Sequence, residues 1–121
     1  MERESNFAFG EVMKNRSKDF ALRTIRLFQA LPKSAEAQIM GKQVLRSATS
    51  VAANYRARSG AEFVAKIGIA LEEADETQFW LELLEESGIV ASNRIVDLKK
   101  EAGELTAILT SIRKSASKKK N

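Results

Sequence analysis

The sequence predicts an all-α protein, built as an antiparallel up-and-down four-helix bundle. Glycine and proline interrupt the chain at only a few places, with six glycines and one proline among 121 residues. Between these interruptions the apolar residues recur at helical spacing, and no stretch has the alternation of a strand. Short connections between long amphipathic helices favour antiparallel neighbours. One domain is therefore expected over residues 1–121.

The first helix is predicted from about Asn15 to Leu31, because Pro32 stops it. Residues 1–14 have little periodicity and are predicted to form an N-terminal leader, with the bundle spanning 15–113. The residues predicted to face the core share one broad apolar stripe: Ala21, Leu22, Ile25, Phe28 and Leu31.

The second helix is predicted to begin near Ser34, whose hydroxyl suits an N-cap. Its core stripe advances in steps of three and four: Met40, Val44, Ala48, Val51 and Tyr55. The opposite face combines bases with small residues: Lys42, Arg46, Thr49, Ala53 and Arg56. This face suits either phosphate or the acidic face of a neighbouring subunit, around Glu72 and Glu76.

The third helix is predicted over about 60–87, with residues 59–62 as a capping box and Gly88 as the stop. Ser92 is expected to cap the fourth helix. The core seam of that helix has largely heptad spacing: Ile95, Leu98, Ala102, Leu105, Leu109 and Ile112. Residues 114–121 are predicted to form a polar basic tail.

The third helix carries more apolar surface than one core requires. Phe63, Ile67, Leu71, Ala74 and Leu81 share one face. Further large apolar residues lie on other faces, which either makes the helix buried all round or marks a subunit interface. The interface is the favoured interpretation, and its predicted residues are Ile69, Glu72, Glu76, Phe79, Trp80 and Leu83.

The residue inventory argues against an enzyme. The chain has no cysteine and no histidine, which excludes thiolate sites and removes the commonest general base and metal ligand. The acidic run from Glu72 to Glu86 cannot complete the usual Glu-x-x-His centre of helical bundles, so a solvated acidic face is the better interpretation. No catalytic residue, metal or cofactor is therefore expected, although an oxygen-only cation site stays open as a lesser alternative.

Charge is strongly segregated along the chain. Residues 1–61 hold 11 basic and 5 acidic residues, 62–104 hold 4 and 11, and 105–121 hold 5 and none. Either the segments pair with one another or the surface is polarised and attracts a polyanion. No segment has the apolar length of a membrane span or a signal peptide, which predicts a cytoplasmic protein without a membrane partner.

Two motifs resemble a known family. The first is Gln43-Val-Leu-Arg-Ser-Ala-Thr-Ser-Val-Ala-Ala-Asn-Tyr-Arg56, and the second is Gly68-Ile-Ala-Leu-Glu-Glu-Ala-Asp-Glu-Thr-Gln-Phe-Trp-Leu-Glu-Leu-Leu84, followed by Gly88. Both resemble the bacterial four-helix-bundle proteins related to the 23S ribosomal RNA intervening-sequence protein. Many relatives read Asn-Ile-Ala-Glu-Gly where this chain has Asn54-Tyr-Arg-Ala-Arg58, a departure that adds two positive charges.

The resemblance implies a cyclic homopentamer with no established catalytic residues. Members are encoded in ribosomal RNA genes, and a related branch, the accessory variability determinant of diversity-generating retroelements, binds nucleic acid and a reverse transcriptase. The partners it implies are thus further copies of the chain, RNA or DNA, and a reverse transcriptase or ribosomal component.

Two hypotheses about function follow. The first is a non-enzymatic, oligomeric bundle that binds nucleic acid through its basic faces. The second is a protein-interaction scaffold whose arginines form salt bridges between subunits, with no nucleic-acid role. The predicted nucleic-acid contacts are Arg23, Arg26, Lys42, Arg46, Arg56, Arg58, Lys118, Lys119 and Lys120.

Overall fold

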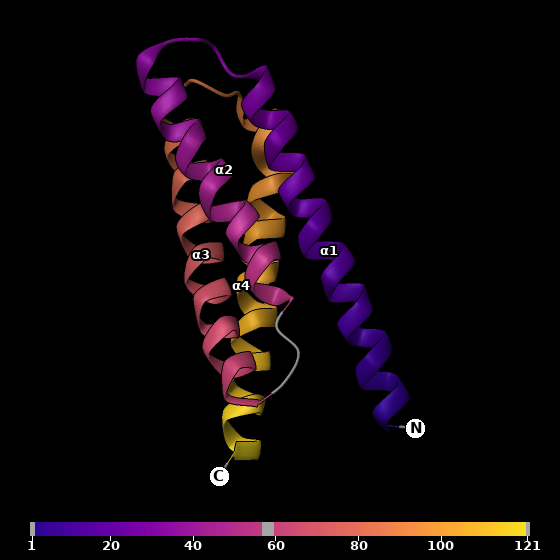
Figure 1. The fold of residues 1–121 in the computed structure, drawn as a ribbon. Coiled ribbons are helices and arrows are strands. Elements are labelled where there is room, and N and C mark those ends of the chain that lie inside the picture. The colour runs from indigo at the N-terminus through magenta and orange to yellow at the C-terminus, as the bar shows by residue number, and fades with distance from the viewer. Residues whose placement is uncertain (1, 57–59, 121) are drawn as a thin grey trace.

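Four antiparallel helices form the fold. The computed structural model describes residues 2–56 and 60–120, with side chains described for 8–56 and 61–118. The helices are α1 (Glu2–Ala30), α2 (Ala35–Tyr55), α3 (Gly60–Glu86) and α4 (Ser92–Lys120). They alternate in direction, so that both termini lie at the same end of the molecule (Figure 1). Within the described ranges there is no strand, and the predicted all-α up-and-down bundle is confirmed.

Successive helices are the main neighbours. α2 packs on α1 and α3, and α3 packs on α4, whereas α1 contacts α4 only sparsely. The N-terminal half of α1 diverges from the other helices in Figure 1. An ion-pair cluster joins α1 to α4 there: Arg16 donates to both carboxylate oxygens of Glu101 at 2.7 Å and to Glu104 at 2.9 Å. These hydrogen bonds, led by the one to Glu101, raise the pKa of Arg16 above its ordinary value.

Helix α1 differs from its prediction in length and in register. It begins at Glu2 instead of Asn15, so the helix continues through the predicted leader. Leu22, expected in the core, is 42% exposed. The buried side follows a four-and-three spacing that includes two hydroxyl residues: Met13, Ser17, Phe20, Thr24 and Leu31.

The hydroxyls on the buried side of α1 are satisfied by its own backbone. Ser17 Oγ donates to the carbonyl of Lys14 at 3.1 Å, and Thr24 Oγ1 donates to that of Ala21 at 2.7 Å. Because each donor has a partner within its own helix, a small polar residue occupies a core position without an unpaired buried group. The predicted stripe is thus confirmed at Ala21 and Leu31, which are buried, and at Phe28, which packs against the core, but it misses the buried hydroxyl residues.

Helix α2 matches its prediction. Ser34 is the N-cap, and its Oγ accepts from the amide of Ala37 at 3.4 Å. Val44, Ala48, Val51 and Tyr55 are buried, and Met40 packs against the same core. The small residues on this stripe permit close approach of the neighbouring helices.

The connection between α3 and α4 is built around Gly88, which has a φ of +80°. Its amide donates to the carbonyl of Glu85 at 3.0 Å, and the amide of Val90 donates to that of Leu84 at 3.1 Å. Glycine adopts this left-handed conformation without strain, which explains why α3 ends here as predicted. Ser92 is the first helical residue of α4 and not its cap. Ser59, from the predicted capping box, lies outside the described residues.

Most of the predicted apolar faces of α3 and α4 belong to the core. Ile67, Ala74 and Leu81 of α3 are fully buried, and the seam of α4 from Ile95 to Leu109 is buried as expected. Phe63, Leu71 and Ile112 pack against this core from its edge. The α4 helix continues to Lys120, past the predicted start of the tail at residue 114.

We predict that Gly41→Ala is less stable than Gly68→Ala by about 1–3 kcal/mol. A Cβ atom at Gly41 would lie 2.5 Å from Cδ1 of Leu31 and 2.9 Å from Cδ1 of Phe28, so these two side chains would have to shift. A Cβ atom at Gly68 meets the Arg113 guanidinium at 3.7 Å, an ordinary contact. Both variants share the gain in helix propensity, so their difference in urea denaturation isolates the clash. Equal stabilities would contradict the close packing of α1 on α2.

Candidate nucleic-acid interface

The predicted basic residues occupy three separate places. Arg23 and Arg26 lie beside α4, near the end of α1. Lys42 and Arg46 lie on the exposed side of α2. Arg56 is the C-cap of α2, and Lys118 lies in the last turn of α4. The side chains of Arg58, Lys119 and Lys120 lie outside the described residues. The predicted nucleic-acid contacts that the structure describes therefore lie on separate surfaces of the bundle.

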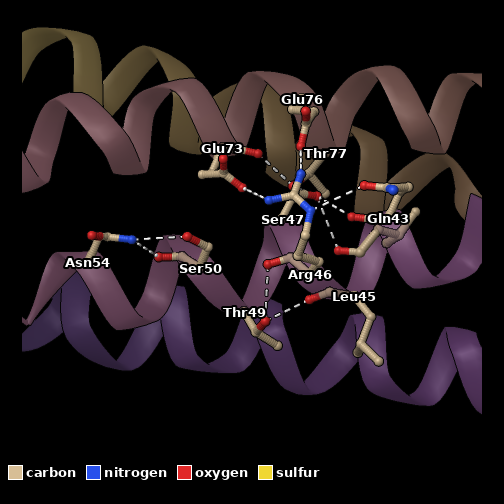
Figure 2. A network of polar contacts seen from close by, with 11 residues as sticks. Gln43, Leu45, Arg46, Ser47, Thr49, Ser50, Asn54, Glu73, Glu76 and Thr77 are labelled. Carbon is tan, nitrogen blue, oxygen red and sulfur yellow. Dashed lines mark hydrogen bonds and ion pairs between the residues drawn. The ribbon is translucent and has the colours of Figure 1, made fainter.

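Arg46 is engaged within its own chain. Figure 2 shows its guanidinium between α2 and α3, where Nη1 donates to Glu73 at 2.9 Å and Nη2 pairs with Glu76. Its Nε also donates to Oε1 of Gln43 at 3.1 Å. The predicted pairing of Arg46 with a neighbouring subunit is thus replaced by pairing within the hairpin, because α2 and α3 run antiparallel side by side. Its charge is largely neutralised, which makes it a poor phosphate contact.

A buried hydroxyl pair fixes the same hairpin. Thr77 Oγ1 lies 2.7 Å from Oγ of Ser47 and 2.7 Å from the carbonyl of Glu73, while Ser47 Oγ donates to the carbonyl of Gln43 at 2.7 Å (Figure 2). Both residues are fully buried. Every hydroxyl therefore has a partner, and sliding α2 along α3 would separate the pair. Ser47 belongs to the first of the two motifs that carry the family resemblance, and Thr77 belongs to the second. The two motifs therefore meet in the packing of α2 on α3.

Further basic side chains lie toward the end of the bundle that holds the C-terminus. We call this surface the basic pole, and its members come from the end of α2, the start of α3 and the end of α4: Arg56, Lys66, Arg113, Lys114 and Lys118. The Arg113 guanidinium lies over Gly68 of α3, close enough to contact an added Cβ atom at 3.7 Å. Residues 37–56 and 105–120 contain no acidic residue, and Glu62 is the only one between residues 60 and 71.

Of the basic pole, Lys66, Arg113 and Lys114 are not among the nucleic-acid contacts predicted from the sequence. The signal was present in the long acid-free stretches at the ends of α2 and α4. Only the up-and-down topology brings those stretches to one end, as Figure 1 shows. The basic pole is therefore a property of the fold as much as of the sequence.

The C-terminal half of α3 is acidic. Seven carboxylates lie between Glu72 and Glu86, and some are paired with bases of the adjacent helices. Lys99 Nζ donates to Oε1 of Glu85 at 2.6 Å, so α4 is tied to α3 near their connecting turn. Over the described residues, no three acidic side chains converge as a metal site would require.

The pair of Lys99 and Glu85 predicts a pH dependence. The hydrogen bond from Lys99, followed by one from Ser92, lowers the pKa of Glu85, and the bond to Glu85 raises the pKa of Lys99. A lowered acid pKa contributes stability above its ordinary value of 4.5, which is lost as the pH falls through the folded-state pKa. A raised lysine pKa contributes stability that is lost as the pH rises through it, above 10.5.

We therefore expect Lys99→Met to lower the melting temperature at about pH 7 and to have a smaller effect at about pH 2.5. The exposed neighbour Lys100 provides the control, and Lys100→Met should change the melting temperature little at either pH. A deficit of Lys99→Met that stays the same across this range would show that packing of the lysine stem, and not the ion pair, is responsible.

An apolar stripe on α3 faces outward, as predicted for an interface. We call it the α3 outer stripe; its residues follow steps of three and four: Ile69, Glu72, Glu76, Phe79 and Leu83. The apolar members are 41%, 50% and 37% exposed in that order. Trp80 lies beside the stripe, with its ring 5.1 Å from that of Phe79 in an edge-to-face arrangement, and its buried Nε1 has no hydrogen-bond partner. Within the stripe, Glu76 is already paired with Arg46.

Comparisons with known proteins give one family. A family model described as the 23S rRNA-intervening sequence protein matches residues 11–111. A crystal structure from Bacteroides thetaiotaomicron, of a protein with unknown function from the S23 ribosomal protein family, is 38% identical, with a TM-score of 0.79. The similarity covers 87% of this chain and 97% of that chain. A comparison with curated proteins finds no match. Among the described helices, none has the length and apolar character required to cross a membrane.

Proposed function

Because this chain belongs to the 23S rRNA-intervening sequence protein family, we propose that it is a non-enzymatic protein that binds structured RNA through the basic pole. The observation that carries the proposal is the gathering of five basic side chains toward one end of the bundle. The segments that carry them, residues 37–56, 60–71 and 105–120, contain only one acidic residue, Glu62. A nucleic-acid backbone is the polyanion that such a surface attracts, since each neutralised phosphate releases counterions.

The proposal assigns different roles to the two charged halves of the molecule. The acidic half of α3 is partly compensated by Arg46 and Lys99, so it belongs to the helix packing. Among the residues whose side chains are described, no carboxylate forms an ion pair with the basic pole, which leaves its bases available for phosphate. Lysine and arginine side chains at helix ends reach phosphates along a groove without specifying a sequence. We therefore expect affinity without strong sequence preference.

We further propose that the protein acts as a homo-oligomer, with five subunits as in the assembly that the family resemblance implies. The α3 outer stripe supports this assembly, because exposed aromatic and aliphatic side chains in a row are typical of subunit contacts. A ring of subunits would present several basic poles to one RNA molecule, and several weak contacts on one assembly raise the overall affinity. Arg46, which the scaffold alternative assigns to a salt bridge between subunits, pairs with Glu73 and Glu76 of its own chain.

The test of RNA binding is the salt dependence of affinity for a structured RNA, measured by fluorescence anisotropy. If four or five phosphates are neutralised, the affinity should fall steeply, by a power of roughly three to four in the salt concentration. No binding at low salt, or an affinity that is independent of salt, would overturn the proposal.

The test of the oligomer is Phe79→Asp. We expect this charge in the α3 outer stripe to lower the subunit number measured by light scattering, because it would be buried without a partner. Leu22→Asp is the matched control: Leu22 is also exposed, on α1 and outside the stripe. A protein that is monomeric before any substitution, or a Leu22→Asp variant that dissociates equally, would contradict the assignment of the interface.

A further inference from the structure

A groove between α1 and α4 lies away from the basic pole, near the connection between α3 and α4. Three arginines line it, Arg23 and Arg26 from α1 and Arg94 from the first turn of α4, together with one acid, Asp97. Its other walls are the apolar side chains of Leu27, Ala30 and Leu98. The groove has a volume of about 320 Å³ and is open to solvent.

The arginines of this groove differ from Arg16 and Arg46, which are held in ion pairs. Arg16 is held by Glu101 and Glu104, and Arg46 by Glu73 and Glu76. In the described part of the chain, no carboxylate lies within ion-pair distance of the three groove arginines. Three like charges around one hollow repel one another unless an anion joins them.

We propose that this groove binds a phosphate monoester. Three guanidinium groups and one carboxylate leave a balance of two positive charges, which matches the charge of about −1.5 to −2 on a terminal phosphate near pH 7. Guanidinium groups bind phosphate oxygens in pairs, so residues from two helices can hold one phosphate. The apolar walls suit the carbon skeleton that carries the phosphate. This site is separate from the basic pole and does not rest on the proposed RNA binding.

The first test is isothermal titration calorimetry of the protein with adenosine 5′-monophosphate and, separately, with adenosine. The nucleotide should bind and adenosine should not. Arg94→Gln should weaken the nucleotide by about tenfold or more, because one charged hydrogen-bonding partner is lost. Lys100→Gln is the matched control, since it removes the same charge from an exposed position of α4 outside the groove and should change affinity less than twofold.

Asp97→Asn gives a result of opposite sign. Removal of the one negative charge in the groove should strengthen nucleotide binding severalfold. The proposal is overturned if the nucleotide does not bind at millimolar concentration, if adenosine binds equally well, or if Lys100→Gln weakens binding as much as Arg94→Gln. Circular dichroism of each variant checks that these surface substitutions leave the helices intact.

Competition then distinguishes the two sources of such a phosphate. A short RNA with a 5′-phosphate that displaces the nucleotide, where the same RNA with a 5′-hydroxyl does not, assigns the groove to RNA ends. Failure of both RNAs to compete assigns it to a small phosphorylated molecule. Equal competition by both would show binding of backbone phosphodiesters and contradict the monoester.

Discussion

Phe20→Ala is expected to lower the free energy of unfolding by about 3–5 kcal/mol. Phe20 is 0% exposed and is among the largest fully buried side chains. Phe20 lies on α1, which packs on α2 and only sparsely on α4. The buried Phe20 ring therefore contributes to the apolar contact that holds α1 on the bundle. Truncation removes this burial and leaves a cavity that the remaining helices cannot fill without moving.

The measurement is urea denaturation followed by circular dichroism, with Phe9→Ala as the matched control. Phe9 is on the same helix but is 48% exposed, so its loss should cost well under half as much. A typical domain is stable by about 5–15 kcal/mol, so the expected loss at Phe20 is a large part of the total stability. In the Phe20→Ala variant, the amides of α1 should exchange hydrogen at lower urea concentrations than the amides of α3. Equal effects of the two alanine variants would show that α1 is not anchored at Phe20.

The sequence predicted the fold well where apolar residues alone form the buried face. On α2 the stripe from Val44 to Tyr55 was predicted residue by residue, and on α4 the seam from Ile95 to Leu109 was predicted as well. Both helices have apolar side chains at nearly every core position. Helical periodicity then gives the register directly.

The prediction was incomplete on α1, where Ala21 and Leu31 are buried as expected but Ser17 and Thr24 also occupy core positions. Their hydroxyls return to carbonyls of the same helix, and no pattern of hydropathy distinguishes such a residue from a solvent-facing one. The same reason explains why Ser47 and Thr77 were not expected in the core. Small polar residues at helix contacts are visible only when the partner helix is known.

The candidate sites were predictable in charge but not in arrangement. The sequence showed that the first and last segments are basic and that α3 is acidic, and it placed exposed apolar residues on α3. It did not show that Arg46 is neutralised within the hairpin, or that Arg94 joins Arg23 and Arg26. Those relations join residues far apart in the chain and depend on which helices are neighbours.

The second large effect concerns the basic pole. Replacement of Lys66, Arg113, Lys114 and Lys118 by glutamine is expected to weaken binding of structured RNA by about 100-fold or more at low salt. Each phosphate contact contributes roughly 0.7 to 0.9 to the slope of log affinity against log salt. The salt dependence should therefore become shallower by about three units, while the subunit number and the melting temperature stay close to those of the unmodified protein.

A variant with the same loss of charge provides the control. Lys18, Lys33, Lys42 and Lys100 are exposed and lie outside the basic pole, and their replacement by glutamine lowers the net charge equally. If position matters, this variant should keep most of its affinity and a steep salt dependence, since long-range attraction is screened beyond about 10 Å at 0.1 M salt. Equal losses in both variants would mean that the total charge of the protein, and not the meeting of three helix ends, determines its affinity for RNA.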